Sequence, residues 1–578
     1  MSTSKEKLFQ EGFKVKKTNI FRGLAALMTF LLSISVIVGN TLESFSSTID
    51  TALGTQSEMM VTDDQDAVYN RFTPPAELLN EDGTGNSHAL IQAAIDLNRK
   101  QAAEGTVLLK NNGVLPLSTG ASVTLFGIRS QVPILGSSFG VKAFGGFINL
   151  DEALQNNITD FAHHITTSLS QNWATGQVER GYTTDGWSGD EFEFDGAGYK
   201  VNPTMTSIYQ KLNETYLHTE NAGPSEEYDP GEPSVKEIES VNASYKDSFA
   251  QYGDASIVVI GRPSAESEDY LPGGIVSGLG AEEPLALTTN ERDAIALAKE
   301  CSDKVIVLVN SASAVEIGEL KDNPDIDAIL WIGAPGSYGM LGVADILVGK
   351  TSPSGGLADI FATYNMSAPA MQNMGNFSYK NADVITRENS SNYIIEAEGI
   401  YVGYRYYETR YFDAVLGEGN ATGTAGAYAS TSGWDYDKEV AYGFGYGLSY
   451  TTFDMEYEGE PVFNVKKDGD VTTATATFNV KVTNTGNVAG KKSVQIYGQA
   501  PYERGGIEKS AIQLLNYAKT DLLQPGESQT VPVEVDLQYI ATYDSSLTTG
   551  TELSEPISQT PEHITSHSVT ARTMRSTT

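Results

Sequence analysis

The chain has 578 residues, which at the ~150 residues of a typical domain predicts roughly three or four folded units. Its 74 acidic and 38 basic residues give a formal net charge of −36, and this argues against a DNA or RNA partner because such binding depends on cationic side chains. The single cysteine, Cys301, excludes an internal disulfide and a zinc site built on several thiolates, and the six histidines form no HExxH motif, so we expect no metal and no other cofactor.

The amino terminus contains a basic segment followed by an apolar run. Residues 23–39 carry no charge, and Lys14, Lys16, Lys17 and Arg22 precede them. About 17 residues is the lower limit for a membrane-spanning helix, and a basic flank faces the cytoplasm. We therefore expect a cytoplasmic basic segment over 1–22, a transmembrane anchor over 23–40 and a polar stalk over 41–88.

A cleaved signal peptide is the alternative for the same residues. The run is long for such a peptide, and Gly39-Asn40-Thr41 is a poor cleavage signal. Both interpretations place most of the chain outside the cytoplasm. The protein would be either a single-pass protein of the cell membrane or a secreted one.

The pattern changes after the stalk to apolar strands that alternate with helices. A helical pattern over 89–103 precedes strand-like runs at 123–128, 256–260, 305–309 and 327–332. Uninterrupted apolar strands of this kind are typical of a parallel sheet covered on both faces. Thr288 and Glu291 form a capping box that starts one of the helices. We expect an α/β domain over 89–450, in which the less regular region 150–250 is an insertion.

From residue 453 onward the pattern is alternating. Residues 473–483 and 493–497 alternate apolar and polar side chains, with turn residues at 484–486 and 525–526. Strands at this spacing predict an antiparallel β-sandwich over 451–545. The Ser- and Thr-rich tail, 546–578, shows no packed pattern, and we expect it to be disordered.

The most informative local feature is a loop with three carboxylates, Glu266, Glu268 and Asp269, which follows the apolar run 256–260. Open α/β sheets place their chemistry at the carboxyl ends of strands. A carboxyl in apolar surroundings can stay protonated near neutral pH, as a general acid requires. Glu266 is the candidate proton donor, and a merely solvated surface loop is the alternative.

Three other motifs have weaker functional interpretations. Residues 399–411 place five tyrosines around Arg405 and Arg410, which suits either stacking on sugar rings, with Tyr404 and Tyr406 as candidates, or an aromatic strand packed in a domain interface. Residues 333–339 lack the GxGxxG spacing and predict a tight strand-to-helix turn. Residues 136–140 fit GxSxG, but without a histidine partner they indicate an ordinary loop.

Several segments of this chain resemble glycoside hydrolase family 3, many members of which are β-glucosidases and β-xylosidases. The similar segments within 89–450 are 104–117, 310–313, 328–336, 353–357, 398–408 and 442–450, and those after it are 482–490 and 519–526. The resemblance implies an α/β sandwich domain with a mostly parallel sheet, followed by a fibronectin-III-like module. It also implies hydrolysis of terminal β-linked glycosides or oligosaccharides.

The resemblance assigns a role to one residue of the carboxylate loop. The family's acid/base glutamate lies in a Gly-Glu-Gly-x-Asp pattern, which matches residues 265–269 and carries the role to Glu266, with Asp269 in the accompanying position. Both glycines of the pattern are replaced in this chain, so Glu268 is the reserve candidate. No substrate-binding residue is assigned.

The family's nucleophile is an aspartate on a (β/α)8 barrel, in a motif resembling Ser-Asp-Trp that this sequence lacks. Such a barrel needs about 250 residues, whereas 88 residues precede the predicted sandwich domain and 33 follow residue 545. A retaining glycosidase needs two carboxyls about 5–5.5 Å apart. We therefore expect the acid/base half of an active site, inactive alone, with a separate barrel domain as its possible partner.

A second hypothesis belongs to another functional class. In it, the chain is a non-catalytic, membrane-anchored carbohydrate-binding or scaffold protein that uses the tyrosine-rich segment.

Overall fold

The computed structural model describes residues 21–22, 24–32, 75–79, 86–136, 148–155, 167–172, 177–182, 196–216, 231–262, 283–372, 377–378, 392–393, 395–396, 398–417, 434–468, 471–499 and 508–540. The chain divides into two compact units, Met1–Pro75 and Ala76–Thr578. The described part of the first unit is helical over 21–22 and 24–32, and its large apolar side chains are exposed.

The transmembrane helix predicted over 23–40 is not supported. Within the parts of the chain that the structure describes, no helix is both long and apolar enough to cross a membrane. The helical residues that the structure describes, 24–32, make up only part of the ~17 residues that a spanning helix needs. The rest of that prediction, residues 33–40, lies outside the described residues, as do most of the predicted stalk and the whole tail 546–578.

The second unit contains the predicted α/β domain, built on a six-stranded sheet with the order β1-β8-β7-β6-β2-β5. Four parallel pairings join β8 to β7, β7 to β6, β6 to β2, and β2 to β5. At one edge, β1 pairs with β8 in the antiparallel direction, so the sheet is mixed. The strands are β1 (Val107–Asn111), β2 (Ser122–Phe126), β5 (Lys200–Val201), β6 (Ala255–Arg262), β7 (Val305–Ser311) and β8 (Ala328–Trp331).

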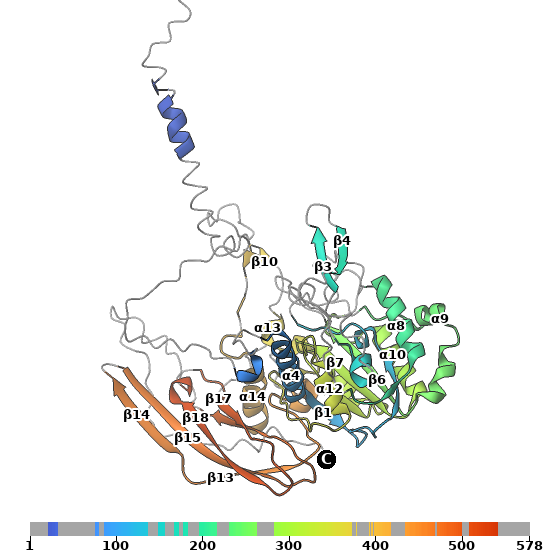
Figure 1. Ribbon diagram of the computed structural model, residues 1–578. Coiled ribbons are helices and arrows are strands. Elements are labelled where there is room, and N and C mark those ends of the chain that lie inside the picture. Colours follow the sequence, from blue (N-terminus) through green and yellow to red (C-terminus); the bar gives the residue numbers. More distant parts are fainter. Residues whose placement is uncertain are drawn as a thin grey trace, which may run out of the picture. The chain divides into compact units, whose positions relative to one another are not determined.

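Helices cover both faces of this sheet, as the uninterrupted apolar strands predict. Alternate residues of β6 face opposite layers: Val258 and Ile260 pack in one core cluster, and Ile257 and Val259 in the other. The first cluster includes residues of α8 (Pro203–Tyr216), α9 (Val235–Val241), α10 (Thr289–Cys301) and α11 (Gly318–Asp322). The second includes residues of α4 (Ser87–Gly105), α6 (Leu150–Leu154) and α12 (Met340–Leu347). Figure 1 labels α4, α8, α9, α10 and α12 around the sheet.

The described parts of region 150–250 are not a separate insertion, because β5 joins the main sheet and α6 and α8 contribute to its two cores. The remaining described elements before residue 450 are short. They are η1 (Ala76–Leu78), η2 (Ile128–Ser130), β3 (Thr167–Asn172), β4 (Gln177–Tyr182), η4 (Tyr245–Gln251), β9 (Phe361–Ala362), η5 (Asn365–Ser367), α13 (Pro369–Gln372), β10 (Phe377–Ser378), β11 (Asn392–Tyr393), α14 (Tyr404–Tyr411), the π-helical η7 (Phe412–Leu416), α15 (Tyr436–Glu439) and β12 (Val440–Tyr442).

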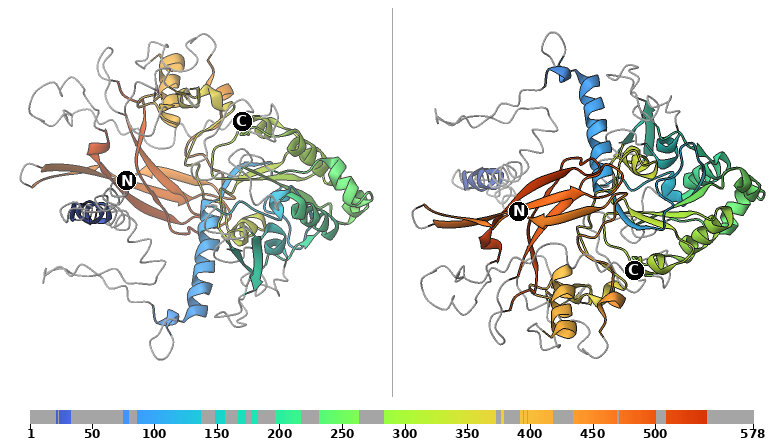
Figure 2. Two further views of the ribbon diagram at one scale, coloured as in Figure 1. Left: turned by 90° about the horizontal axis from the view of Figure 1, so that it is seen from above. Right: turned by 90° about the horizontal axis from the view of Figure 1, so that it is seen from below.

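The predicted β-sandwich follows. Its central strand, β15 (Val471–Asn484), pairs antiparallel with β13 (Phe453–Tyr457), β14 (Val462–Asp468) and β18 (Ser528–Asp536). A second sheet pairs β16 (Ser493–Gly498) with β17 (Gln513–Lys519), and η8 (Leu537–Ile540) ends the described chain. The buried residues of both sheets form one core cluster. These strands carry the orange and red end of the colour scale in Figure 2.

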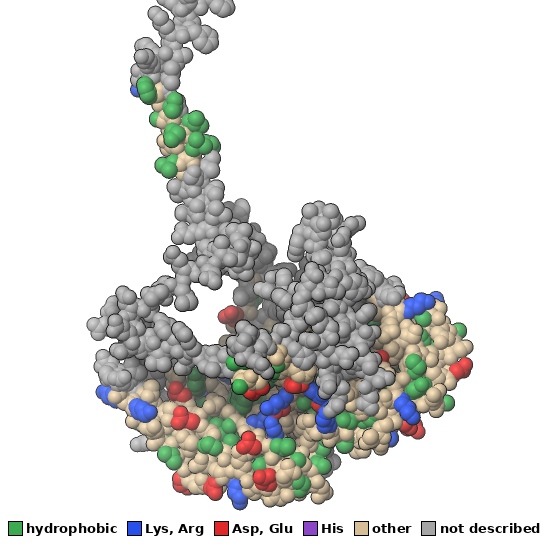
Figure 3. Space-filling model, in the orientation of Figure 1, with side chains coloured by type: hydrophobic (Ala, Val, Ile, Leu, Met, Phe, Trp, Pro, Cys, Tyr) green, Lys and Arg blue, Asp and Glu red, His purple; other side chains and the backbone are tan. Residues whose placement is uncertain are grey.

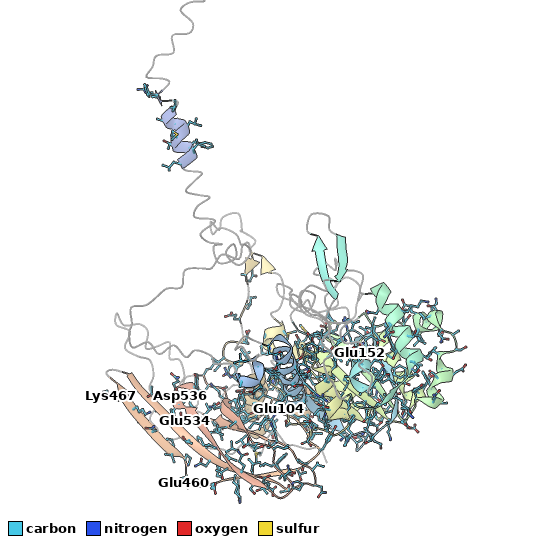
Figure 4. All side chains as sticks on the ribbon, in the orientation of Figure 1. Glu104, Glu152, Glu460, Lys467, Glu534 and Asp536 are labelled. Atoms are coloured by element: carbon cyan, nitrogen blue, oxygen red, sulfur yellow. The ribbon has the colours of Figure 1, made fainter. Side chains whose placement is uncertain are left out.

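Charged contacts join α4 to the β-sandwich. Glu104, near the end of α4 and labelled in Figure 4, lies 2.5 Å from Lys491 and 3.4 Å from Lys519. Burial acts to raise the pKa of Glu104, but the two lysines outweigh it and hold the pKa below its ordinary value. The surface that Figure 3 shows has acidic and basic side chains interspersed over the described residues.

Candidate active site

The carboxylate loop begins and ends at the carboxyl edge of the parallel sheet. Glu266, Glu268 and Asp269 belong to 263–282, which lies outside the described residues. The residue before this segment, Arg262, is the last of β6, and the segment returns at Glu283, shortly before α10 begins. The predicted position of the loop after a buried strand is confirmed. The placement of the three carboxylates themselves stays a prediction.

Arg262 is the central described residue at this edge, and its side chain is 4% exposed. Its guanidinium makes a bidentate ion pair with Glu291 of α10, with N–O distances of 2.6 and 2.7 Å. It also donates to the backbone carbonyls of Gly261, Pro284 and Ala286. An arginine side chain has five N–H donors, and these contacts use every one of them.

Glu291 is as deeply buried as Arg262, and it has a second role. Its side chain accepts hydrogen bonds from the backbone N–H and the hydroxyl of Thr288, and the Thr288 hydroxyl accepts from the backbone N–H of Glu291. This is the capping box that the sequence predicts, and it begins α10. The ion pair therefore joins the carboxyl end of β6 to the amino end of α10.

A small pocket with a cavity volume of about 10 Å³ lies beside Arg262. Most of its lining is apolar, from residues that flank the carboxyl ends of β6 and β7: Ile260, Leu285, Leu287, Val309, Val315 and Ile317. Its polar side chains are those of Arg262, Ser311 and Glu316. Pockets that enclose a small ligand usually measure ~300–1,000 Å³. This pocket is too small to serve as a complete substrate site.

Glu316 is a half-buried carboxyl at the same edge. Burial raises its pKa to about 6, although a hydrogen bond from the backbone N–H of Asn365 acts in the opposite direction. The backbone N–H of Glu316 donates to Leu285 at 2.8 Å, which ties it to the returning end of the loop. One oxygen of this carboxyl is thus used to hold the backbone.

A second carboxyl with a raised pKa, Glu232, lies at the carboxyl end of β2. Burial raises its pKa to about 8, and the nearby charge of Glu291 adds to the increase. Its side chain accepts from the backbone N–H of Ile128 at 2.8 Å and contacts the hydroxyl of Tyr209 at 3.2 Å. At Glu232 and Glu316, which among the described residues have no close cationic partner of the kind that Glu291 has, burial favours the protonated carboxyl, and this is the form that a general acid needs.

The tyrosine-rich segment is a helix, α14, and the expectation of an aromatic strand is wrong. Its tyrosines are used in packing. Tyr404 stacks on Phe444 with ring centres 4.3 Å apart and accepts a hydrogen bond from the backbone N–H of Leu514 in β17. Tyr406 is 5% exposed and bonded to Arg410, and Tyr407 is 1% exposed and bonded to Ser367. These contacts join α14 to the β-sandwich and leave little aromatic surface for a sugar.

Other candidate residues have structural positions. Residues 333–339 form the predicted turn between β8 and α12, where Gly333 and Gly336 have positive φ values. Cys301 ends α10, and burial raises the pKa of its thiol. Most of the GxSxG segment, 137–140, lies outside the described residues. Among the residues that the structure describes, no group of three or more His, Cys, Asp or Glu side chains could hold a metal ion.

Sequence reasoning missed the roles of Arg262, Glu291 and Glu232. The sequence contains one indication of the role of Arg262. A buried strand that ends in arginine must place a hydrogen-bonding or anionic group next to that cation. No local signal identified the partner, since Glu291 is 29 residues away and already had an explanation as a helix cap. Glu232 could not be identified either, because the sequence around it shows no helical or strand periodicity.

Comparisons with known proteins add an independent line of observation. Residues 106–450 match the glycosyl hydrolase family 3 C-terminal domain, and residues 492–550 match a fibronectin type III-like domain. The chain is 31% identical to a beta-glucosidase of Ruminococcus albus, covering 78% of this chain and 36% of that protein. It is also 31% identical to beta-glucosidase A of Butyrivibrio fibrisolvens, covering 78% of this chain and 47% of the relative.

A solved structure is also similar to this chain. The crystal structure of a beta-glucosidase from Paenibacillus barengoltzii is 26% identical, with a TM-score of 0.55, and the match covers 78% of this chain and 39% of that one. The chain thus spans less than half the length of each of these relatives.

Proposed function

The chain belongs to glycosyl hydrolase family 3, and from this premise we propose that it carries the acid/base half of a retaining β-glucosidase, with Glu266 as the proton donor. The substrate would be a terminal β-glucoside, because beta-glucosidases are prominent among its relatives. Glu268 is the alternative donor, since it lies two residues away in the same loop.

One observation supports this proposal above the others. The loop that contains Glu266 starts and ends at a sheet edge where burial raises the pKa of both Glu232 and Glu316. Burial of a further glutamate at such an edge would likewise raise its pKa. That property suits a group that must protonate a departing glycosidic oxygen.

The proposed reaction divides the work between two carboxyls. Glu266 would donate its proton to the leaving oxygen while a carboxylate nucleophile attacks the anomeric carbon, and it would then take a proton from the water that releases the sugar. No residue described above is placed to act as that nucleophile. We propose that a barrel domain, joined to these residues or supplied by another chain, provides it.

The test is turnover of an aryl β-glucoside by the full chain, alone and with a family 3 barrel domain added. Hydrolysis should appear or rise on addition of the barrel and should fall by ~100-fold or more in Glu266→Ala, within the range that general acid–base catalysis contributes. Glu300→Ala, which removes an exposed carboxyl on α10, is the matched control and should keep full activity. Equal activity in Glu266→Ala, or loss only in Glu268→Ala, would reject the assignment to Glu266.

We also propose that the enzyme acts outside the cytoplasm. The support is the basic flank and the uncharged run over 23–39. Cell fractionation followed by sequencing of the mature amino terminus tests this. A membrane-bound intact chain or a secreted cleaved chain would agree with it, and recovery of the intact chain in the cytoplasm would contradict it.

A further inference from the structure

We infer that Arg262 and Glu291 are positioning residues for the reaction of Glu266: as a pair they hold both ends of the carboxylate loop against the start of α10. The inference rests on the proposed acid/base role of Glu266. Arg262 and Glu291 are both described residues, and the inference assigns neither of them a direct contact with the substrate.

Contacts on both sides of segment 263–282 support this role. Arg262 itself is the residue at which the loop begins, and its guanidinium bonds to Pro284 and Ala286, just after the loop returns. Glu291 anchors that guanidinium through both of its carboxylate oxygens. One side chain thus fixes the separation of the two loop ends, and a helix cap fixes that side chain.

Stability alone is a poor explanation for this arrangement. Arg262 and Glu291 are 3% and 2% exposed, and removing two such charges from water costs several kcal/mol per ion before their attraction offsets it. Apolar residues of similar volume often replace a buried pair without loss of stability. An apolar pair could not fix the orientation of the neighbouring backbone in this way. The guanidinium can, because it is planar and holds its five donors in a fixed geometry.

The expected consequence for catalysis is specific. A general acid must lie about 2.6–3.2 Å from the atom that it protonates, and a displacement of ~1 Å can cost ~100-fold in rate. Misplacing the acid should matter most for glucosides with a poor leaving group, which need protonation. A dinitrophenyl leaving group departs without such help.

The test variant is Arg262→Met with Glu291→Gln. It is uncharged, so neither partner is left as an unpaired buried ion, and glutamine keeps the capping box with Thr288. The matched control is Arg99→Met with Asp345→Asn, which removes another bidentate pair, at 2.6 Å, between α4 and α12 on the opposite face of the sheet. Both proteins are studied as full chains.

With a barrel domain added, the test variant should lose ~10-fold more kcat/KM on phenyl β-glucoside than on dinitrophenyl β-glucoside, within the range of general acid catalysis. The control should lose the same factor on both substrates. An equal loss on both substrates in the test variant would overturn the inference, because a purely structural defect lowers the amount of active protein and not its discrimination.

A second readout needs no activity and separates this inference from the proposed function. Spin labels are placed at Ser264→Cys, two residues after Arg262, and at Asp303→Cys, which is fully exposed, in a chain whose own cysteine is changed by Cys301→Ala. The distance distribution between the labels should broaden in the test variant and stay unchanged in the control. An unchanged distribution in the test variant would reject the inference, whereas broadening without turnover in any protein would reject only the proposed function.

Discussion

Replacing Glu232 with glutamine should change how the stability of the protein depends on pH. Glu232 is 7% exposed, and its side chain interacts with the backbone N–H of Ile128 and the hydroxyl of Tyr209. Glutamine has nearly the same shape. Its amide oxygen can keep accepting from the backbone N–H of Ile128, and its amide N–H can donate to the Tyr209 hydroxyl in place of the bond that the hydroxyl now donates to Glu232. The substitution therefore removes the titration of this site and preserves its packing.

The direction of this pH dependence follows from the pKa of Glu232. In the folded chain the pKa of Glu232 is about 8, above its ordinary 4.5, so the unfolded chain loses this proton at a lower pH than the folded chain does. The stability contributed by the protonated group is complete below pH 4.5 and is lost as pH rises through about 8. At about 1.4 kcal/mol for each pH unit in this window, the wild-type protein should lose about 2 kcal/mol between pH 6 and pH 8 through this one residue.

Urea unfolding of both proteins at pH 6 and pH 8 measures this effect. The Glu232→Gln protein should gain about 2 kcal/mol relative to the wild type over that range. The control, Glu300→Gln, changes an exposed carboxyl on α10 and should follow the wild type. If the stability difference between Glu232→Gln and the wild type is the same at both pH values, then Glu232 is not held protonated, and burial does not raise its pKa as described.

Three further predictions concern the framework around the site. Gly127→Ala should destabilise the protein by more than ~3 kcal/mol, because φ is +89° and a Cβ would lie 2.2 Å from a backbone oxygen of β6. Gly120→Ala is the control: φ is +74° but the space around it is open, so it should cost only ~1 kcal/mol. Thermal unfolding compares the two variants. Tyr404→Phe should cost ~1 kcal/mol in urea unfolding, since it removes the hydrogen bond to the β-sandwich and keeps the ring stack, and no loss would mean that this bond is unimportant. Glu104→Gln should weaken the attachment of the β-sandwich to α4, seen as faster hydrogen exchange in β16 and β17. The difference from wild type should shrink in high salt, and also as the pH falls through the pKa of Glu104, which the two lysines lower from its ordinary 4.5.

Features that depend on local pattern could be predicted from the sequence. The buried strands at 256–260 and 305–309 are apolar on both faces, which identifies a covered parallel sheet. The cap formed by Thr288 and Glu291 is encoded within four residues and is present as expected. The position of the carboxylate loop at a strand end followed from the same reasoning.

Features that depend on distant contacts could not be predicted in this way. Tyrosine favours strands by local propensity, yet α14 is a helix because its tyrosines gain packing against Phe444 and Ser367. The antiparallel direction of β1 is set by its pairing with β8, more than 200 residues later. The pairing of Arg262 with Glu291 likewise requires the folded sheet edge.

The most direct test of the central claim is the response of Glu266→Ala to azide, with a barrel domain present and dinitrophenyl β-glucoside as substrate. This substrate does not need an acid to form the glycosyl-enzyme, and azide can then release the sugar without the base that water requires. If Glu266 is the acid/base, azide should raise the rate of the variant and yield the β-glucosyl azide. An azide-independent rate, or the same response in Glu268→Ala instead, would contradict the account.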